Sequence, residues 1–342
     1  MQNKFQDTLE AKIPNADSFL LFRQPNSDLV ELWGNDKTET ENQFVFHSFQ
    51  SDKEIIFQSK EVLKIPVSEL SESKSILLPT SSKTEAILYE DYIDLISKTV
   101  EFLKDESNPT KKIVISRIKE IPNTGVNLIQ TFKKIHQYYP KAYVYLWYTK
   151  EEGVWIGASP ELLLEEENLE IKTVSLAGTL PKEEEWTSKE IHEQQVVTDY
   201  IVSKLKDTQH LVVDGPHTVD AGFFNHLKSY ISAKVTAYNQ VKSILQELHP
   251  TPAVCGMPKE NAKDFILNNE GYDRKFYAGY FGYKTPNKSL YFVNLRCAQV
   301  FENVVKLYVG GGIMPDSSPE KEWKETEMKS KTIGNLLVTD RT

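Results

Sequence analysis

Two pairs of glutamates at helical spacing could carry chemistry in this sequence. Glu322, Glu325 and Lys329 stand at positions i, i+3 and i+7 of the charge-rich stretch "SSPEKEWKETEMKSKTI", so a helix there places them on one face. Glu190 and Glu193 repeat the i, i+3 spacing in an earlier helical stretch. Four carboxylates brought together would suit a hard divalent cation with oxygen ligands, most simply Mg²⁺.

Each pair also has a simpler interpretation. A Glu-x-x-Glu spacing on a surface helix usually marks a solvated face. Glu190 can equally close a capping box with Thr187, because Thr-x-x-Glu fits that motif. In the later stretch, Ser318 suits the N-cap and Pro319 the first helical position. The spacing alone therefore leaves both the metal site and the solvated face open.

A glycine run precedes the later pair. The stretch "YVGGGIMP" places three glycines, 310–312, at the end of a strand. Glycines let a backbone approach a ligand closely and direct N–H groups at an anion. No Lys-Ser or Lys-Thr follows, so this is not a P-loop. A simple bend or bulge is the alternative.

Three single residues could move protons or contact a ligand. Lys112 begins the strand "KIVISRIKEI", on the face opposite to Arg117. A lysine whose pKa is lowered by burial can act as a general base, although such a lysine more often only ends a strand. Glu161 follows a small-residue turn, where a lone glutamate is usually solvated. His249 lies in a proline-rich turn, and a lone histidine is more often structural than a ligand.

The composition limits the classes of partner. Of the 342 residues, 39% are hydrophobic and 26% are charged, which is typical of a globular protein. The formal net charge of −9 argues against nucleic acid or an anionic membrane as the main partner. Cys255 and Cys297 form no motif and are expected to be free thiols in a reducing compartment. Neither a signal peptide nor an apolar span is visible, so a cytoplasmic location is expected.

The strands and helices that must position these residues are expected to follow one another without a regular order along the chain. Apolar alternation predicts short strands within the first 80 residues and longer strands at 112–121, 142–149, 154–159, 162–167, 169–178, 232–239, 276–283, 290–301 and 304–312. Helical periodicity predicts helices at 88–105, 125–138, 187–206, 239–248, 259–269 and 317–333. Many strands with interspersed helices favour an α+β fold with sizeable antiparallel sheets.

Eight segments together resemble the motifs of one enzyme family. In chain order they are "KKIVISR", "GASPELLL", "SLAGTLP", "KEIHEQQVV", "LHPTPAVCGMP", "FYAGYFG", "NLRCAQV" and "GGGIMPDSSPEKEWKETEMK". They resemble, in the same order, the motifs of chorismate-utilising enzymes, which include isochorismate, salicylate, anthranilate and aminodeoxychorismate synthases. The resemblance runs from about Lys112 to Lys331, and the first hundred residues carry no motif that matches.

The resemblance implies a fold and a substrate. It implies an α+β fold of two large facing antiparallel β-sheets flanked by helices, with the active site between them. It implies one chorismate-binding domain over 1–342, in which 1–105 form a short N-terminal part of the sheets and 106–335 the catalytic region. Chorismate is then the substrate, Mg²⁺ the cofactor, and a monomer the expected state. Chorismate is a dianion and the protein is acidic, so a cation is expected to bridge their carboxylates.

The resemblance also implies a role for each matching residue. Lys112 resembles the general base that activates water, and Glu161 the general acid that protonates the departing hydroxyl. Glu193 and Glu325 resemble the principal metal ligands, with Glu190 and Glu322 beside them. The residues implied in substrate binding are Gly178, Thr179, His249, Tyr277, Arg296, Gly311, Gly312 and Lys329.

The branch of the family follows from two positions. Aminodeoxychorismate synthases commonly carry a lysine in a P-I-K-G-T motif, where this chain has "SLAGT" with Ala177. Anthranilate synthases lack the water-activating lysine, whereas Lys112 is present here. Isochorismate synthase is therefore the expected activity, with salicylate synthase as the alternative and a non-catalytic chorismate-binding relative as a third. Menaquinone and siderophore synthesis both draw on isochorismate, and the sequence does not distinguish them.

Overall fold

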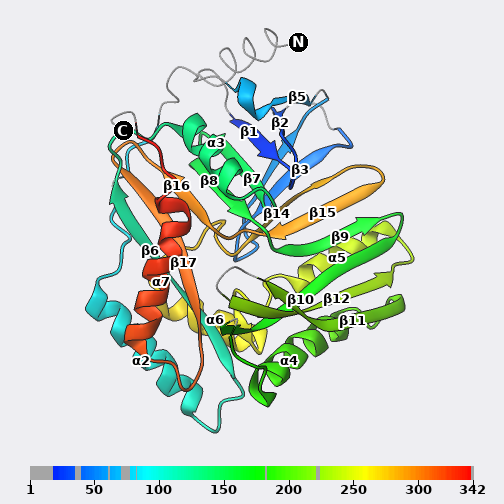
Figure 1. The fold of residues 1–342 in the computed structure, drawn as a ribbon, viewed down its shortest axis with the longest axis vertical. Coiled ribbons are helices and arrows are strands. Elements are labelled where there is room, and N and C mark those ends of the chain that lie inside the picture. The colour runs from blue at the N-terminus through cyan, green and yellow to red at the C-terminus, as the bar shows by residue number, and fades with distance from the viewer. Residues whose placement is uncertain are drawn as a thin grey trace.

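The computed structural model describes residues 18–34, 40–60, 62–70, 78–81, 83–181, 183–220 and 224–339. Two β-sheets dominate the described part, and all pairings between their named strands are antiparallel. They match the expected α+β fold of two large sheets flanked by helices (Figure 1).

The nine-stranded sheet carries the glycine run and Lys112. Its order is β13 (Gly256–Met257), β6 (Lys112–Pro122), β17 (Val304–Ile313), β16 (Cys297–Val300), β8 (Gly153–Ser159), β7 (Tyr143–Thr149), β1 (Ser18–Arg23), β2 (Leu29–Trp33) and β5 (Leu63–Pro66). Within it Gly311 pairs with Ile115 and Gly312 with Val114, so the glycine run lies beside the start of β6.

The eight-stranded sheet carries the "SLAGT" segment. Its order is β11 (Gln209–Asp220), β12 (Phe224–Lys234), β10 (Glu170–Pro181), β9 (Leu162–Glu167), β15 (Lys288–Val293), β14 (Tyr280–Lys284), β3 (Gln43–His47) and β4 (Glu54–Gln58). β10 pairs with β12 along most of its length, with a bulge between Ala177 and Thr179. Gly178 lies in this bulge with φ of +70°, a conformation that glycine adopts without strain.

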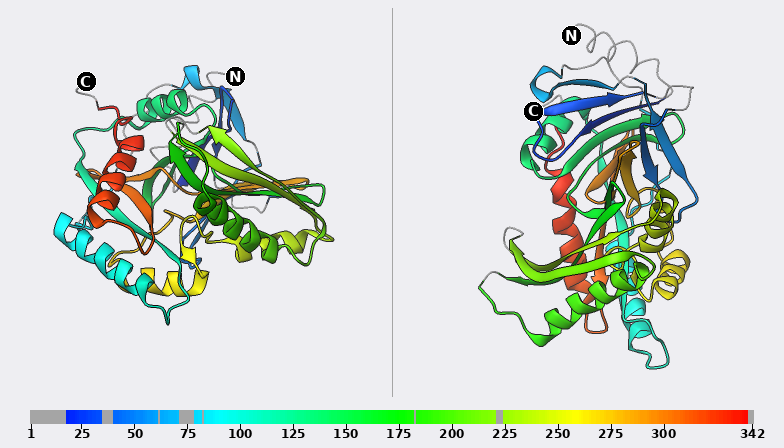
Figure 2. Two further views of the ribbon diagram at one scale, coloured as in Figure 1. Left: turned by 60° about the horizontal axis from the view of Figure 1, so that its bottom comes forward. Right: turned by 90° about the vertical axis from the view of Figure 1, so that its right-hand side faces the viewer.

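The helices lie on opposite sides of the molecule. They are α2 (Tyr89–Lys104), α3 (Leu128–Tyr138), α4 (Ser188–Lys204), α5 (Tyr238–Leu248), α6 (Lys259–Asn269) and α7 (Pro319–Gly334), together with the short 3₁₀ helix η1 (Val67–Glu69). Figure 2 separates a side with α2 and α7, in cyan and red, from a side with β10, β12 and α4, in green. None of the described helices is long and apolar enough to cross a lipid bilayer.

Aromatic side chains fill the core between the sheets. The ring centroids of Phe46 in β3 and Trp147 in β7 lie 5.1 Å apart, and those of Phe22 and Phe44 lie 4.6 Å apart. In β1, Leu20 and Phe22 belong to this core, while the alternate residues pack on the outer face beneath α3. Because successive side chains of the strand point to opposite faces, β1 contributes to the hydrophobic packing on both faces of its sheet.

Three sequence predictions about strands are wrong. The stretch 276–283 is a strand only from Tyr280, where β14 begins after a turn. The stretch 290–301 is not one strand, because β15 ends at Val293 in one sheet and β16 begins at Cys297 in the other. Asn294 holds the corner, since it accepts a hydrogen bond from Tyr145 Oη at 2.6 Å and donates one to the Phe276 carbonyl at 2.8 Å. The stretch 232–239 is a strand only to Lys234, and α5 begins at Tyr238.

Candidate active site

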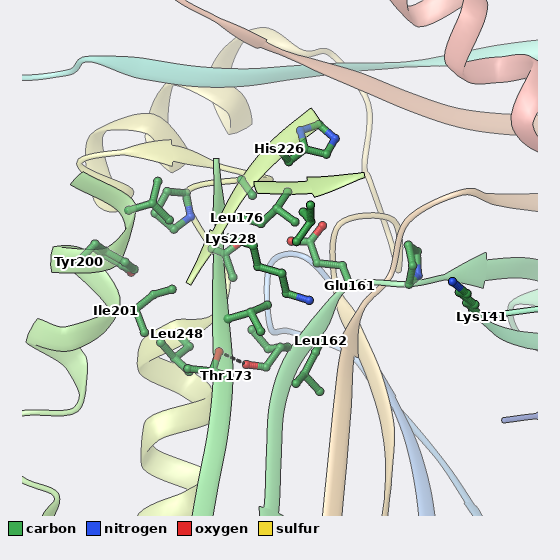
Figure 3. Close-up of a pocket in the computed structure, with 18 of the residues that line it drawn as sticks. Lys141, Glu161, Leu162, Thr173, Leu176, Tyr200, Ile201, His226, Lys228 and Leu248 are labelled. Carbon is green, nitrogen blue, oxygen red and sulfur yellow. Dashed lines mark hydrogen bonds between the residues drawn. The ribbon is translucent and has the colours of Figure 1, made fainter. Parts of the chain in front are cut away.

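Two neighbouring cavities lie against the sheets, the larger against the eight-stranded sheet and the smaller against the nine-stranded sheet. The larger, of about 610 Å³, is lined by Glu161, Lys228, Lys141 and apolar residues of β10 and α4 (Figure 3). The smaller, of about 280 Å³, is lined by the glycine run, Tyr277 and Lys329 among others. Arg296 and Ala253 line both cavities, so they mark the junction between the two.

Lys112 lies at the edge of this region, at the first position of β6. Its Nζ is 3.6 Å from Glu193 Oε1 of α4. Its Cε passes over the backbone of β17, because a Cβ added to Gly312 would lie only 2.8 Å from that atom. Gly312 is therefore the residue that lets the lysine side chain cross the strand.

Glu161 projects into the larger cavity from the turn after β8. Val293 N–H donates to the Glu161 carbonyl at 3.0 Å, and the Ser159 hydroxyl donates to the Val293 carbonyl at 2.5 Å. Burial raises the pKa of the Glu161 carboxyl above its ordinary value, and the positive charges of Arg296 and Lys112 oppose part of that rise. A carboxyl that resists ionisation is suited to donate a proton.

Five of the residues predicted to bind substrate line the smaller cavity together. They are Tyr277, Arg296, Gly311, Gly312 and Lys329. Burial raises the pKa of the Tyr277 phenol, so its hydroxyl stays neutral. Lys329 Nζ donates to the Gly310 carbonyl at 2.9 Å. The cavity thus combines an arginine, a lysine, a phenol and bare backbone, which are groups that bind carboxylates.

The glutamates of α7 face the glycine run. A Cβ added to Gly311 would lie 3.0 Å from Glu322 Oε2 and 3.8 Å from Glu325 Oε1, so glycine provides the room for both carboxylates. The Ser317 hydroxyl donates to Glu322 Oε1 at 2.8 Å, and Lys329 Nζ is 2.7 Å from Glu325 Oε1. Burial raises the pKa of the Glu322 carboxyl, partly opposed by the Ser317 hydrogen bond.

The glutamates of α4 approach from the other sheet. Glu193 reaches Lys112, as described above. Glu190 accepts hydrogen bonds from the backbone N–H of Thr187 at 3.0 Å and from the Thr187 hydroxyl. The bond from the Thr187 N–H is the glutamate half of the capping box that the sequence allowed as an alternative. Gly178 packs beneath this turn, where a Cβ would lie 3.2 Å from the Glu190 carbonyl oxygen.

The carboxylates fit a hard cation by their chemistry. All four are oxygen donors of the kind that Mg²⁺ takes, and Gly311 leaves open the space in front of the α7 pair. Within the described part of the chain, three or more acidic, histidine or cysteine side chains do not converge into one cluster. Lys112 and Lys329 each form an ion pair with the second glutamate of one pair, Glu193 and Glu325. The metal roles of Glu190, Glu193, Glu322 and Glu325 stay predictions.

Two predicted substrate contacts whose surroundings the structure describes, Gly178 and His249, are not among the residues that line the two cavities. His249 is 3% exposed and packs against Tyr280, with ring centroids 5.0 Å apart, and against His47. Burial lowers the pKa of His249 to about 3, so the ring is neutral. This environment favours the structural interpretation of His249, although a substrate contact stays a prediction. The side chain of Thr179 lies outside the described part of the structure.

Comparison with known proteins agrees with the motifs. The sequence matches the family described as chorismate binding enzyme over residues 35–338. The chain belongs to this family. The chorismate-binding family thus accounts for most of the chain, including part of the N-terminal region in which the sequence alone revealed no motif.

Similar proteins of this family include isochorismate synthases. The isochorismate synthase MenF of Escherichia coli is 35% identical over 199 residues, covering 54% of this chain and 46% of that protein. The chain thus spans about half the length of this curated relative. The structure of the menaquinone-specific isochorismate synthase MenF from Escherichia coli matches with a TM-score of 0.81 at 21% identity, covering 96% of this chain and 91% of that one.

The same fold serves another branch of the family. Anthranilate synthase component I from Streptococcus pneumoniae matches with a TM-score of 0.72 at 15% identity, covering 92% of this chain and 89% of that chain. At such identities the structural matches show the fold alone. The branch of this chorismate-binding enzyme must therefore be argued from its site residues.

Sequence reasoning missed several residues around the site of this chorismate-binding enzyme. Lys228 and Lys141 line the larger cavity, although each stands alone in its sequence context. Arg117 was placed only on the opposite strand face, yet its guanidinium lies 3.9 Å from the Trp323 ring centroid and holds α7. The signal available in the sequence was an arginine among the apolar residues of a strand, but the helix it contacts begins only at Pro319, so no local pattern indicated this contact.

Proposed function

We propose that the protein is an isochorismate synthase. Water adds at C2 of chorismate and the C4 hydroxyl leaves, so the product is an isomer of the substrate. Lys112 takes the proton from the attacking water, and Glu161 gives a proton to the departing hydroxyl, which leaves as water. The position of Glu161 at the cavity that Arg296 also lines is the observation that carries this assignment, and burial raises the pKa of its carboxyl, which keeps the acid protonated at higher pH.

The two groups reach the substrate region from different elements. Lys112 comes from β6 and Glu161 from the turn after β8, and the positive charge of Lys112 acts on the Glu161 carboxyl. Arg296 lies at the junction of the cavities and would take the enolpyruvyl carboxylate, with backbone N–H groups of the glycine run. A base and an acid held on different elements suit a reaction that changes two ring carbons.

The carboxylates of α4 and α7 would hold Mg²⁺, with Glu193 and Glu325 as the main ligands. When bound, the cation would supply positive charge to the ring carboxylate of chorismate. Lys329 adds positive charge beside Glu325, its Nζ 2.7 Å from Oε1. Ala177 supports the water-using branch, because no lysine is present there to attack the ring. A cytoplasmic location and a monomeric state remain predictions from the sequence.

Product analysis tests this proposal directly. Purified protein is mixed with chorismate and Mg²⁺, with and without a chelator, and the products are identified by NMR. We expect isochorismate alone, formed only while Mg²⁺ is free, with activity restored when Mg²⁺ is added in excess of chelator. Salicylate with pyruvate would instead assign the salicylate synthase alternative. Absence of turnover in excess Mg²⁺ would contradict the proposal and favour the non-catalytic relative.

A further inference from the structure

The larger cavity contains cations to which the proposed chemistry gives no role. The predicted substrate contacts gather around the smaller cavity, where Arg296 and the glycine run lie. The larger cavity, of about 610 Å³, extends from Arg296 past Glu161 to Lys228 and Lys141. These two lysines come from segments far apart in the sequence, so their meeting at one cavity is a property of the fold.

Lys228 projects into this cavity from the middle of β12. Its neighbours across the sheet are Leu176 in β10 and His217 in β11. The residue is half-buried, and its side chain extends into the space that Glu161 also lines (Figure 3). Its ammonium lies over the face of Tyr230, with Nζ 4.8 Å from the ring centroid. No carboxylate of the described residues lies within ion-pair distance of this Nζ.

Lys141 lies across the cavity from Lys228. It is exposed, just before β7, and in the view of Figure 3 the two lysines lie on opposite sides of Glu161. With Arg296 they place three cations along this cavity, against the carboxylates of Glu161 and Asp220. The charged side chains that line this cavity therefore carry a net positive charge, whereas the chain as a whole carries −9.

This local positive charge matters for a doubly negative ligand. The net charge of the chain repels a dicarboxylate at long range, and only a local positive potential can attract it to the cavity. A half-buried lysine without a carboxylate partner keeps its full charge available to a ligand, because no neighbouring anion neutralises it. The low-dielectric walls of a cavity strengthen that attraction relative to open water.

We propose that Lys228, together with Lys141, forms an anion-binding vestibule that receives the dicarboxylate substrate before it reaches Arg296. The inference rests on the proposed function, since it takes chorismate as the dianion. Lys228 holds a carboxylate of the incoming ligand, and Arg296 at the cavity junction takes it over. The vestibule thus acts on substrate capture and does not take part in proton transfer.

Salt-dependent kinetics of Lys228 variants test the vestibule. At low ionic strength, Lys228→Ala should raise KM for chorismate about three- to tenfold, and Lys228→Glu should raise it further. The loss should fall on KM rather than on kcat, and it should shrink as salt screens the charge. Lys228→Arg should restore most of the affinity. Titration calorimetry with chorismate should show the same order of affinities.

Lys234→Ala is the matched control. Lys234 ends the same strand, is exposed, and its replacement removes the same charge without touching the larger cavity. If Lys228→Ala and Lys234→Ala behave alike while the wild-type protein converts chorismate, the vestibule is overturned and the proposed function stands. A defect of Lys228→Ala that does not change with salt would also overturn it. Failure of the wild-type protein to bind or convert chorismate would overturn both proposals.

Discussion

Helices α4 and α7 carry their glutamate pairs in the same order, but they come from opposite sides of the molecule. The first glutamate of each pair accepts a hydrogen bond from a hydroxyl near the start of its own helix. Glu190 is bonded to Thr187, and Glu322 is bonded to Ser317 at 2.8 Å. These contacts fix the first carboxylate of each pair relative to its helix terminus.

The second glutamates differ in their cationic partners. Glu325 pairs with Lys329 of its own helix at 2.7 Å, four residues later. Glu193 reaches Lys112, which belongs to the other sheet, at 3.6 Å. The cation that pairs with Glu325 therefore belongs to the same helix, whereas the cation that pairs with Glu193 is Lys112, the predicted general base. If Lys112 is the base, as proposed, the contact with Glu193 would couple α4 to the proton transfer, whereas α7 would act on ligand binding.

Charged groups anchor α7 to its sheet. Arg117 of β6 donates to Thr326 Oγ1 at 2.9 Å and to Glu327 Oε1 at 2.5 Å, and Lys119 Nζ donates to Glu327 Oε2 at 2.6 Å. The Arg117 guanidinium also stacks on the Trp323 ring. This arrangement sets the rotation of α7, and so it sets which face its glutamates present to the glycine run.

Neutral groups anchor α4 to its sheet. The Gln194 amide accepts from Ala177 N–H at 2.8 Å and donates to the Ser175 and Ser229 hydroxyls at 2.9 and 3.1 Å. Gln194 is 1% exposed, so these bonds are made out of water. The two helices thus reach equivalent positions through different chemistry, and substitutions can separate their contributions.

Loss of Lys112 should have the largest effect. Lys112→Ala should lower turnover about 100- to 10,000-fold, because the water loses its proton acceptor. Lys111→Ala is the control, since it removes the same charge from the adjacent exposed position. Steady-state assays of both variants, with circular dichroism to confirm folding, measure the difference. Near-normal turnover of Lys112→Ala would break the assignment of the base.

Neutralising the second glutamates should separate the two helices. Glu325→Gln and Glu193→Gln should each raise the Mg²⁺ concentration needed for half-maximal activity about 10- to 100-fold. Only Glu193→Gln should also lower kcat at saturating Mg²⁺, because its carboxylate contacts Lys112. Glu320→Gln is the control, since that carboxylate is exposed on α7 and bonded to Ser318. Equal effects on kcat would contradict the proposed division between α4 and α7.

Removing the anchors should lower stability by different amounts. Arg117→Met removes the hydrogen bonds to Thr326 and Glu327 and the stacking on Trp323, although Lys119 still pairs with Glu327. This substitution should cost about 2–4 kcal/mol of the free energy of unfolding. Gln194→Met removes the partner of the Ala177 N–H and of the Ser229 hydroxyl, while the Ser175 hydroxyl keeps its bond to Thr198. This loss should cost about 1–3 kcal/mol. Urea denaturation curves measure both values. A smaller cost for Arg117→Met than for Gln194→Met would contradict the charged anchor as the stronger one.

The smallest effect concerns stability at Glu161. Above the ordinary carboxyl pKa of 4.5 the unfolded chain ionises readily, whereas burial raises the pKa in the folded protein. Stability is therefore lost as the pH rises through the raised value. Glu161→Gln does not titrate, so it should melt at a higher temperature than wild type at pH 8, although its turnover is lost. The two proteins should converge below pH 4.5, and a lower melting temperature of the variant at pH 8 would refute the burial argument.

The sequence predicted the features that depend on the spacing of residues within one helix or strand. The faces of α4 and α7 follow from the helical repeat, and the structure places Glu322 and Glu325 on one face toward Gly311. Family motifs brought Tyr277 and Arg296 into the prediction, and the structure sets both at one cavity. Their chemical roles remain to be tested by the variants above.

The features that sequence reasoning missed depend on long-range packing. Nothing in the run 290–301 marks where the chain leaves one sheet for the other, because both halves alternate like strands. Lys228 has no neighbour in sequence that marks a cavity, since Glu161 and Lys141 reach it only through the fold. His249 is buried against His47, a residue about 200 positions earlier, which no local pattern reveals.

The corner at residues 294–296 has a consequence for how the molecule can move. The chain passes there directly from β15 in one sheet to β16 in the other, and Arg296 has a φ of +48°. Any motion that spread the layers apart would pull on this short connection and turn the arginine at the cavity junction. The three residues of this corner thus couple the distance between the two sheets to the position of the arginine at the cavity junction.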